Sequence, residues 1–594
     1  MTAPAASQVE PLSQDTTRST LSTDRSDSEP TGMTLRNGWL QGYSGSIVLR
    51  CCAVVTGVSN ASPSEWVGWR WTLAVGALLP VATASCEATT PPSRPAEEHA
   101  EKVPAGGAEV GGADSAGTQS TAGGADRAIP QGPTPSISDL AIEPNPNLTI
   151  SCYVSWTTDV PSTSEVQFGI DAYEYRIEHR APVTEHRVLV IGMHAGTDYL
   201  LKAVSTTAGG SDEAEGTFST GRLPSEVPLA ERTVAELDSA DTGWTLTNAQ
   251  VGAGPQGFGG RTPAVIVIYD EEGIPVWYYI DGDSADTRGD LSTELLDNLN
   301  VLIGAGASEP PREVDLAGNV VWEGPEQPRP GAAGEPMSHH TGKLDNGNYV
   351  LLRDTISEVY GVGGQRIEEI TPGCERVWEW DIFDHVVPAE NVPSDWCHAN
   401  SVTIDEESDV FYISCRFQGL FKAERYGAQE VIWQMGAAID DPNAGDVTYL
   451  PPESMPSDIH DPEVDIDGGT ILLYDNGGYA TRTGDREADY HSRVLEYAID
   501  EASKTATLVW EFPGDFEVDA WYRDEWYTPY WGDADRLANG NVLVTAGMRG
   551  EGTTTRIFEV TRAGRVVWEI QLESNNGSYR AQRLSPPPLV RRIR

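Results

Sequence analysis

Apolar and polar residues alternate with a period of two along most of the chain from residue 225 to the C-terminus, a pattern that predicts β-strands. Six strand pairs end in similar runs that contain a tryptophan: GIPVWYY, GNVVWEG, CERVWEW, QEVIWQM, ATLVWEF and GRVVWEI. Upstream of these runs a second hairpin pattern recurs, as in LDNGNYVLL and LANGNVLVT. Each unit therefore contains four strands, and we predict a six-bladed β-propeller over residues 225–594, with the tryptophans packed between blades.

A shorter set of alternating runs precedes the repeats, over residues 134–224. These runs include NLTISCYVSWTT, SEVQFGI and TDYLLKAVSTT, and turn residues separate them. Several short strands at this spacing predict a β-sandwich, in which Trp156 lies in the core and Tyr199 forms a tyrosine corner. The segment resembles a fibronectin type III domain. We favour a spacer or a lid over a ligand-binding module.

The N-terminal part, residues 1–86, predicts export. Arg70 is followed by the apolar run WTLAVGALLPVATAS and then by Cys86, which is typical of a lipoprotein signal peptide and too short for a membrane span. The stretch before Arg70 is unusually long, so we expect translation to start downstream of Met1. Residues 87–133 are mostly small or polar and predict a disordered linker. We expect a periplasmic or cell-surface lipoprotein that touches the membrane only through a lipid on Cys86.

The charge of the chain excludes some partners. Acidic residues outnumber basic ones by 90 to 40, and the formal net charge is −50. Such a field repels nucleic acids and anionic membrane surfaces, so we predict no nucleic-acid partner. An anionic substrate would need a locally basic pocket.

Polar side chains recur where the first strand of a repeat begins. Three consecutive repeats carry them: SHHTGKLDNGN with His339 and His340, CHANSVTID with His398 and Asn400, and DIHDPEVDIDGG with His460 and Asp461. Because residues i and i+2 of a strand share a face, we expect His340, His398, Asn400 and His460 to point into the channel, and His339 to point away. A hairpin with its turn at residues 405–409 places Arg416 opposite His398 and on the same face.

Three interpretations of this cluster remain open from the residues alone. Three histidines could bind zinc, although an adjacent arginine disfavours a metal and Asp461 is the one nearby carboxylate. Satisfied polar groups could simply fill the channel. A neutral histidine could also act as a nucleophile, with an asparagine and an arginine holding an oxyanion, which suits sulfuryl or phosphoryl transfer. No phosphate-binding GxxxxGK[ST] loop is present.

The spacing of these motifs carries a resemblance to a known family. The runs HANSVTIDEESDVFYISCR, HDPEVDIDGGTILLYDNGG and RIFEVTRAGRVVWE, together with the closing YRAQRL, resemble the bacterial arylsulfate sulfotransferases from about residue 261 onwards. The resemblance implies a six-bladed propeller with an N-terminal β-domain. It implies sulfuryl transfer from a phenolic sulfate ester to a phenol by a ping-pong mechanism, without PAPS, cofactor or metal.

The resemblance also assigns roles to the cluster. His460 matches the histidine that becomes transiently sulfated, and His398, Asn400 and Arg416 match groups around the bound sulfate. The pair at 339 and 340 matches a further site histidine, for which we favour His340. Members of this family depend on an oxidised disulfide, which matches no cysteine pair in this chain.

Other features leave alternatives. Cys397 and Cys415 are expected to be diagonal neighbours on the opposite face of the hairpin, either as a disulfide or as two buried thiols. Trp526, Tyr527 and Tyr530 are expected either to stack on a substrate ring or to pack in the core. A non-catalytic surface module that binds a partner and a sulfatase-like hydrolase remain the alternative functions.

Overall fold

The computed structural model describes residues 132–593 except 252–263, 282–291, 306–308, 329–333, 389–391, 393, 437–444, 467, 478–490, 520, 523–525, 548–554 and 574–575. The predicted leader with Cys86 and nearly all of the predicted linker therefore lie outside the described residues. The described part is all-β, as predicted, with one short α-helix, Ile382–His385, and one 3₁₀ turn, Pro452–Ser454. Among the described residues, no helix is long and apolar enough to cross a membrane.

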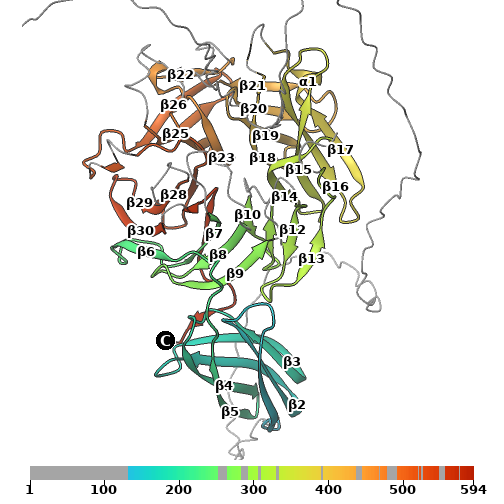
Figure 1. The fold of residues 1–594 in the computed structure, drawn as a ribbon, viewed down its shortest axis with the longest axis vertical. Helices are drawn as coiled ribbons and strands as arrows, with labels where there is room; N and C mark the ends of the chain where they lie inside the picture. The colour runs from blue at the N-terminus through green and yellow to red at the C-terminus, as the bar shows by residue number, and fades with distance from the viewer. Residues whose placement is uncertain are drawn as a thin grey trace, which may run out of the picture. The chain divides into compact units, whose positions relative to one another are not determined.

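The first region is a single curled sheet (Figure 1). Its strands are β1 (Ile137–Pro144), β2 (Cys152–Gly169), β3 (Tyr175–Val190), β4 (Asp198–Thr207), β5 (Gly210–Ser219) and β33 (Arg591–Arg592). Two of the short strands that the sequence predicted are continuous in β2, which pairs with β1 along its first half and with β4 along its second. Trp156 is buried, and the Tyr199 hydroxyl accepts a hydrogen bond from the backbone N–H of His194 at 2.8 Å, as a tyrosine corner requires.

The second region, residues 230–584, contains six further sheets among the described residues. We call it the repeat region. The first sheet contains β7 (Trp244–Val251), β8 (Ala264–Tyr269) and β9 (Pro275–Asp281) with β31 (Asn576–Gly577) and β32 (Ala581–Leu584), and the second contains β10 (Thr293–Leu295), β11 (Val301–Ile303), β12 (Arg312–Val314) and β13 (Val320–Glu323). The third contains β14 (Met337–Lys343), β15 (Tyr349–Ile356), β16 (Gly363–Ile370) and β17 (Arg376–Asp381), and the fourth contains β18 (Ala399–Asp405), β19 (Val410–Cys415), β20 (Gly419–Glu424) and β21 (Val431–Met435). The fifth contains β22 (Thr448–Leu450), β23 (Ile459–Asp465), β24 (Thr470–Asp475), β25 (Arg493–Asp500) and β26 (Thr505–Phe512), and the sixth contains β27 (Asp533–Arg536), β28 (Val542–Ala546), β29 (Arg556–Val560) and β30 (Val566–Leu572) with β6 (Ala230–Ala235).

The two ends of the repeat region complete its last and first sheets. The N-terminal strand β6 pairs with β30, and the C-terminal strand β32 pairs with β7. Both pairings are antiparallel and join segments more than 300 residues apart in sequence. The chain therefore closes on itself, and the fold depends on its C-terminal strand.

The repeated tryptophans connect each sheet to the next. Their indole N–H groups donate to turn carbonyls of the following sheet: Trp277 to Leu316 at 2.9 Å, Trp322 to Pro372 at 3.0 Å, Trp378 to Arg425 at 2.7 Å, Trp510 to Arg562 at 3.0 Å and Trp568 to Glu271 at 3.0 Å. The bond from Trp568 joins the last sheet to the first, so these contacts run round a closed ring. Trp433 is buried in the same position, but its indole nitrogen has no hydrogen-bond partner. The packing role predicted for these tryptophans is confirmed.

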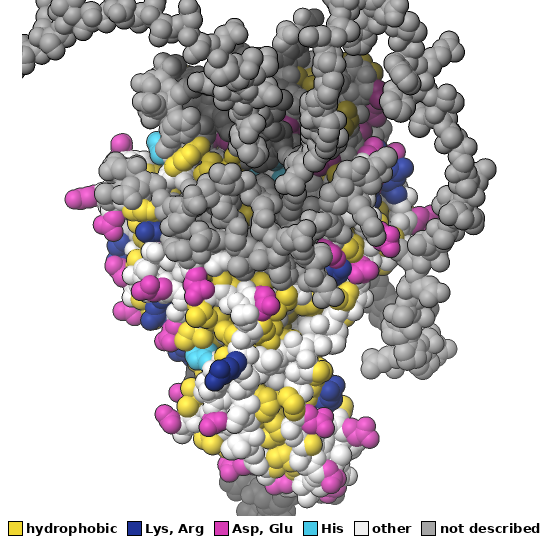
Figure 2. Space-filling view, in the orientation of Figure 1, with side chains coloured by type: hydrophobic (Ala, Val, Ile, Leu, Met, Phe, Trp, Pro, Cys, Tyr) yellow, Lys and Arg dark blue, Asp and Glu magenta, His cyan; other side chains and the backbone are white. Residues whose placement is uncertain are grey.

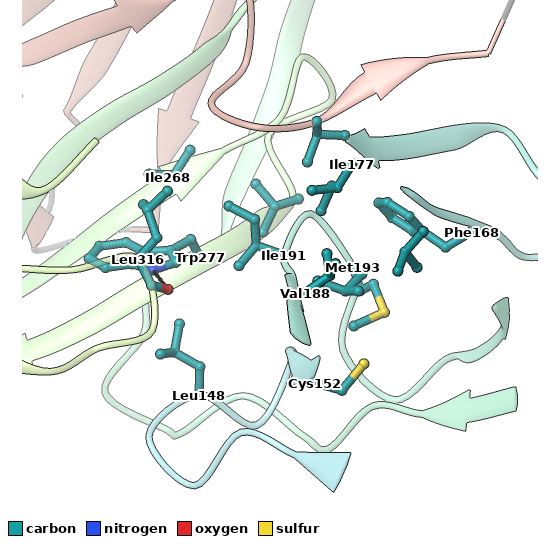
Figure 3. Packing of buried hydrophobic residues seen from close by; sticks show 14 of the residues in the cluster. Leu148, Cys152, Phe168, Ile177, Val188, Ile191, Met193, Ile268, Trp277 and Leu316 are labelled. Carbon is teal, nitrogen blue, oxygen red and sulfur yellow. Dashed lines mark hydrogen bonds between the residues drawn. The ribbon is translucent and has the colours of Figure 1, made fainter. Parts of the chain in front are cut away.

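Trp277 also belongs to a core that reaches into the first region. It packs beside Leu316 and Ile268 from the repeat region, and the same cluster continues through Leu148 and Ile191 of the first region (Figure 3). This core therefore includes side chains of the first region and of the first two repeat sheets. Burial of apolar surface therefore joins the two regions.

The edge strands of the six sheets are neighbours. β32 lies next to β10, β14 next to β18, β18 next to β23, and β23 next to β27, as the central part of Figure 1 shows for several of them. The beginnings of these strands therefore gather at one place, where polar side chains were predicted.

Candidate functional site

The edge strands β14, β18 and β23 are irregular where they begin. Their pairing shifts register between Met337 and Thr341, between Ala399 and Ser401, and between His460 and Glu463. The backbones of His339, His398 and Asp461 adopt positive φ angles of 57°, 53° and 40°. Such bulges interrupt the alternation of side chains and redirect them. Pro462 lies in the third bulge, where its missing N–H removes no ladder hydrogen bond.

His460 is held as a neutral imidazole. Its Nδ1 lies 2.5 Å from Oδ1 of Asn476, whose Nδ2 donates to the carbonyls of Thr528 and Trp531 at 2.7 Å each. These two bonds fix the amide, so His460 Nδ1 carries the proton and Nε2 keeps its lone pair. Burial, and then the positive charge of Arg416, lower the pKa of His460 well below its usual value.

His398 has a different partner. Its Nδ1 lies 2.7 Å from Oδ2 of Asp395, so Nδ1–H donates to a carboxylate and Nε2 is the nitrogen that can exchange a proton. Burial raises the pKa of Asp395, but the hydrogen bond from His398 and the charges of the neighbouring histidines and Arg416 together outweigh it, so the net pKa is lowered. The carboxylate therefore stays ionised and can stabilise a protonated His398. This Asp–His pair suits an acid or base.

Both members of the 339–340 pair lie near the site, because the left-handed backbone of His339 breaks the alternation. The expectation that His339 points away was wrong: its ring lies 4.9 Å from that of His398. His340 instead faces Arg580, whose Nη1 lies 3.4 Å from its Nδ1. Burial and the nearby guanidinium lower the pKa of His340 to about 3.

Arg416 lies opposite His398, as predicted, since its backbone N–H donates to the His398 carbonyl at 3.1 Å. The predicted register was nevertheless wrong along most of the hairpin, where Val402 pairs with Ile413 rather than with Tyr412. The bulge next to Asn400 compensates for this slip of one residue. Sequence patterns do not show where such a bulge falls.

The guanidinium of Arg416 is buried and makes a bidentate contact with the carboxylate of Asp458. Nε donates to Oδ1 of Asp458 at 2.5 Å and Nη2 donates to Oδ2 at 2.9 Å, while Nη2 also donates to the Pro529 carbonyl at 2.7 Å. Asn400 is fully buried, and its Nδ2 donates to the Ile459 carbonyl at 2.7 Å. Its Oδ1 has no hydrogen-bond partner and is therefore an available acceptor at the site.

The sequence interpretation missed Asp458 and Arg580, and it considered Asp461 only as a possible metal ligand. Asp458 and Asp461 stand on either side of His460, and each faces an arginine: Arg416 for the first, and Arg580, with Nε 2.8 Å from Oδ2, for the second. The motif DIHD was the available signal. Arg580 comes from the closing YRAQRL run, and only the ring closure brings it beside His340.

Aromatic side chains surround the charged groups. The Tyr579 ring lies 6.0 Å from His339 and 6.4 Å from His460, and the Tyr530 ring lies 5.3 Å from the guanidinium of Arg416. Phe417 lies 5.5 Å from His398. The three aromatic residues that are expected either to stack on a substrate or to pack in the core differ in their environment. Trp526 is a core residue whose indole donates to Tyr474, Tyr527 is half-buried, and Tyr530 lies beside the site.

A disulfide links the segment just before β18 to the end of β19. Cys397 and Cys415 are bonded, with Sγ atoms 2.00 Å apart, next to His398 and Arg416. Of the two interpretations of this pair, the disulfide is the one observed. Cys152 is buried and free, and burial raises its pKa to about 12.

Acidic side chains are spread over the visible face of the molecule, as Figure 2 shows. Within the cluster each of the two arginines is paired with an aspartate, Arg416 with Asp458 and Arg580 with Asp461. Within the described ranges, no group of three or more His, Cys, Asp or Glu is arranged to hold a metal ion.

Some solved structures are similar to the chain at low scores. A protein of unknown function from Bacteroides caccae is 13% identical, with 59% of this chain and 93% of that one covered and a TM-score of 0.28. A quinonprotein alcohol dehydrogenase-like protein from Bacteroides thetaiotaomicron is 10% identical, with 74% and 95% covered and a TM-score of 0.29. Similarities this weak carry no argument.

No curated protein matches the chain. A family model described as arylsulfotransferase (ASST) matches residues 256–580, which is more than half of the chain. That span contains the whole cluster, from the histidine pair at 339 and 340 to Arg580. The chain therefore belongs to the arylsulfotransferase family.

Proposed function

We propose that this protein transfers a sulfuryl group from a phenolic sulfate ester to a phenolic acceptor through a covalent intermediate on His460, without PAPS or another cofactor. Membership of the arylsulfotransferase family supports an aryl sulfotransferase activity. The observation that carries the mechanism is the hydrogen bond from His460 Nδ1 to the fixed Asn476 amide, because it leaves a lone pair on Nε2 of a neutral imidazole.

The proposal includes the scaffold. We take the six sheets of the repeat region as the blades of a six-bladed propeller, and residues 134–224 as a fibronectin type III-like domain beside it. The ring of tryptophan hydrogen bonds and the pairing of β32 with β7 support the first assignment. The hydrogen bond of Tyr199 supports the second.

In the first half-reaction, the Nε2 lone pair of His460 attacks sulfur, so an N–S bond forms while the bond from sulfur to the phenolic oxygen breaks. The leaving phenolate keeps the electron pair of that bond and takes a proton from Nε2 of protonated His398, which Asp395 stabilises. Because a phenol has a pKa of about 10, its phenolate is a good leaving group. The products are a phenol, neutral His398 and sulfated His460.

In the second half-reaction, the acceptor phenol gives its proton to Nε2 of His398 while its oxygen attacks sulfur. The N–S bond breaks, and its electron pair returns to Nε2 of His460. Both histidines then have their starting protonation. The scheme predicts ping-pong kinetics with no nucleotide requirement.

Arg416 and Asn400 are proposed to bind the substrates. Since two nitrogens of Arg416 already hold Asp458, we expect Arg416 to act on the sulfonate mainly through its charge. Asn400 Oδ1 is a buried acceptor without a partner, and a phenolic hydroxyl could donate to it. A site built in this way would select phenols over acceptors that lack the hydroxyl.

The release of 4-nitrophenol from 4-nitrophenyl sulfate, with and without phenol and EDTA, tests the proposal. We expect phenol to accelerate release, phenyl sulfate to form, and EDTA to have no effect. Release that phenol does not accelerate would indicate a hydrolase, and no release at all would indicate a binding module.

The covalent step has its own test. Donor labelled with ³⁵S should leave acid-labile label on the wild-type protein and none on His460→Ala, while the exposed His179→Ala serves as a matched control that keeps the label. We expect His460→Ala to lose activity by about 10³-fold or more. An unlabelled wild type that still transfers sulfate would overturn the covalent route.

We also propose that the protein is exported and anchored through a lipid on Cys86. The disulfide at Cys397 and Cys415 supports an oxidising compartment. Membrane fractions should contain the wild type, and Cys86→Ser should shift the protein to the soluble fraction. An unchanged distribution of Cys86→Ser would contradict the anchor.

A further inference from the structure

Arg580 lies where the chain closes the repeat region, directly before β32. Its side chain is 11% exposed, and its guanidinium contacts three different edge strands: Nη2 donates to the Asn400 carbonyl at 2.7 Å, Nη1 lies 3.4 Å from His340 Nδ1, and Nε lies 2.8 Å from Asp461 Oδ2. The C-terminal strand therefore delivers a cation to residues from β14, β18 and β23.

The contact with Arg580 determines the tautomer of His340. A guanidinium can only donate, so His340 Nδ1 must be the acceptor and the ring proton must lie on Nε2. Gly342 leaves room on that side, since a Cβ at this position would lie only 3.2 Å from His340 Nε2. A larger residue there would crowd the nitrogen that carries the proton.

This tautomer is the opposite of the other two. His460 and His398 both use Nδ1–H to bond Asn476 and Asp395 respectively, so Nε2 is the atom that attacks sulfur in the first and exchanges the proton in the second. His340 presents an N–H instead. A neutral N–H can stabilise a negative oxygen, but it can neither attack sulfur nor take up a proton at that atom.

We propose that Arg580 is a positioning residue that locks His340 as an Nε2–H donor to a sulfonate oxygen, and so separates its role from those of His460 and His398. The proposal rests on the proposed sulfuryl transfer for the identity of the anion, but not for the tautomer. Asp461 anchors the guanidinium, so the lock depends on the charge pair as well as on the chain closure.

The charged groups around the lock come from several strands. Asp461 and Asp533, from β23 and β27, act on the guanidinium together with the Tyr579 hydroxyl, and Arg580 is the charged group that acts on His340. Burial is the larger cause of the lowered pKa of His340, and the guanidinium adds to it, so removal of the guanidinium should raise this pKa only part of the way. A purely structural role for Arg580 would not change that titration.

The direct test is ¹⁵N NMR of the full-length protein with ¹⁵N-labelled histidine, using His340→Gln to assign the signal. Wild type should show the Nε2–H tautomer for His340 and no protonation down to about pH 5. Arg580→Met, which keeps the length but removes every donor, should show a tautomer mixture and a higher pKa for His340 than wild type. An Nδ1–H tautomer in wild type, or an unchanged His340 signal in Arg580→Met, would overturn the lock.

Two further variants guard against misfolding. Arg580→Met combined with Asp461→Asn removes the unpaired carboxylate and should give the same His340 signal as Arg580→Met. Arg583→Gln is a matched control, because Arg583 lies on the same closing strand but pairs with Glu559 away from the site. It should keep the wild-type tautomer even if its melting temperature falls.

Kinetics then connect the lock to transfer. We expect Arg580→Met to lower kcat by 10- to 100-fold and to move the acid limb of its pH profile upward, while Arg583→Gln keeps the wild-type profile. If the wild type shows the Nε2–H tautomer but no sulfate transfer, the proposed function is refuted, whereas the effect of Arg580 on the His340 tautomer is not. If transfer occurs and the tautomer does not depend on Arg580, only the proposed role of Arg580 is refuted.

Discussion

The repeated tryptophans and the beginnings of the edge strands have different roles in the same sheets: the tryptophans connect the sheets, and the edge strands carry the candidate site. Five tryptophans make the same hydrogen bond to the next sheet, at 2.7 to 3.0 Å, from equivalent positions. The beginnings of β14, β18 and β23 instead have bulges and left-handed residues, and each bulge is different. Equivalent contacts hold the ring, whereas the site is built from contacts that occur once.

This difference has a physical origin. A packing contact between equivalent sheets is satisfied by the same residue each time, so the sequence repeats. A reaction centre needs a nucleophile, an acid and a hydrogen-bond donor to the anion, each in a different orientation. The backbones of adjacent strands must therefore differ from one repeat to the next. The free-energy cost of the irregular backbone at the site is offset by local hydrogen bonds, such as those from Asn476 to two carbonyls.

The largest effect should follow from breaking a buried charge pair at the site. Asp458→Ala leaves Arg416 buried without its carboxylate, and we expect the free energy of unfolding to fall by about 3–5 kcal/mol. Urea denaturation measures this loss. The exposed pair of Arg565 and Glu236 provides the control, since Glu236→Gln should cost less than about 1 kcal/mol. Equal losses in the two variants would refute the distinction between buried and exposed pairs.

The sequence predicted the strands and the packing of the repeat region better than it predicted the site. Period-two alternation and the tryptophan repeat indicated strands, hairpins and packing correctly, because each repeat supplies the same evidence again. The histidine positions were also visible, since four of the ten histidines of the chain occur where the first strand of a repeat begins. These predictions depend on local pattern alone.

The orientation of the site residues could not be predicted in the same way. Alternation assigned His339 to the wrong side, and the register of the hairpin was off by one residue until the bulge at Asn400. Arg580 was missed because it is 240 residues from His340 in sequence. Bulges and ring closure depend on tertiary contacts, which a single sequence does not show.

The frame can be tested by removing one of its repeated bonds. Trp568→Phe loses the indole N–H bond to Glu271, which closes the ring, as well as buried volume, and we expect a cost of about 1–3 kcal/mol in unfolding free energy. Trp433→Phe is the matched control, because that buried indole nitrogen has no hydrogen-bond partner to lose.

Chemical denaturation and transfer kinetics should separate these two variants. Trp568→Phe should be the less stable by about 1 kcal/mol, and both should keep wild-type kcat, since neither contacts the site. A cost for Trp433→Phe that equals or exceeds that of Trp568→Phe would show that the indole hydrogen bonds do not hold the ring.

A smaller change tests the tautomer of His460. Asn476→Asp replaces the amide oxygen by a carboxylate that favours the protonated imidazole, so the pKa of His460 should rise. At pH 7 we expect about a tenfold loss of kcat, which is equivalent to about 1.4 kcal/mol, with recovery at higher pH. A pH profile measures both. A uniform loss at every pH would mean that Asn476 only positions the ring.

The smallest effect per step is the pH dependence of stability. The pKa of His340 is about 3 in the folded protein, and an unperturbed histidine has about 6.5, so the unfolded chain binds the extra proton between these values. The contribution of His340 is therefore fully present above pH 6.5 and is lost as the pH falls towards 3. Its slope is about 1.4 kcal/mol per pH unit. Urea denaturation between pH 6.5 and 4.5 should show a shallower decline for His340→Gln than for wild type, because the carboxylates common to both cancel. Parallel declines would mean that His340 is protonated in the folded state, and the donor role of its Nε2 would then no longer depend on Arg580.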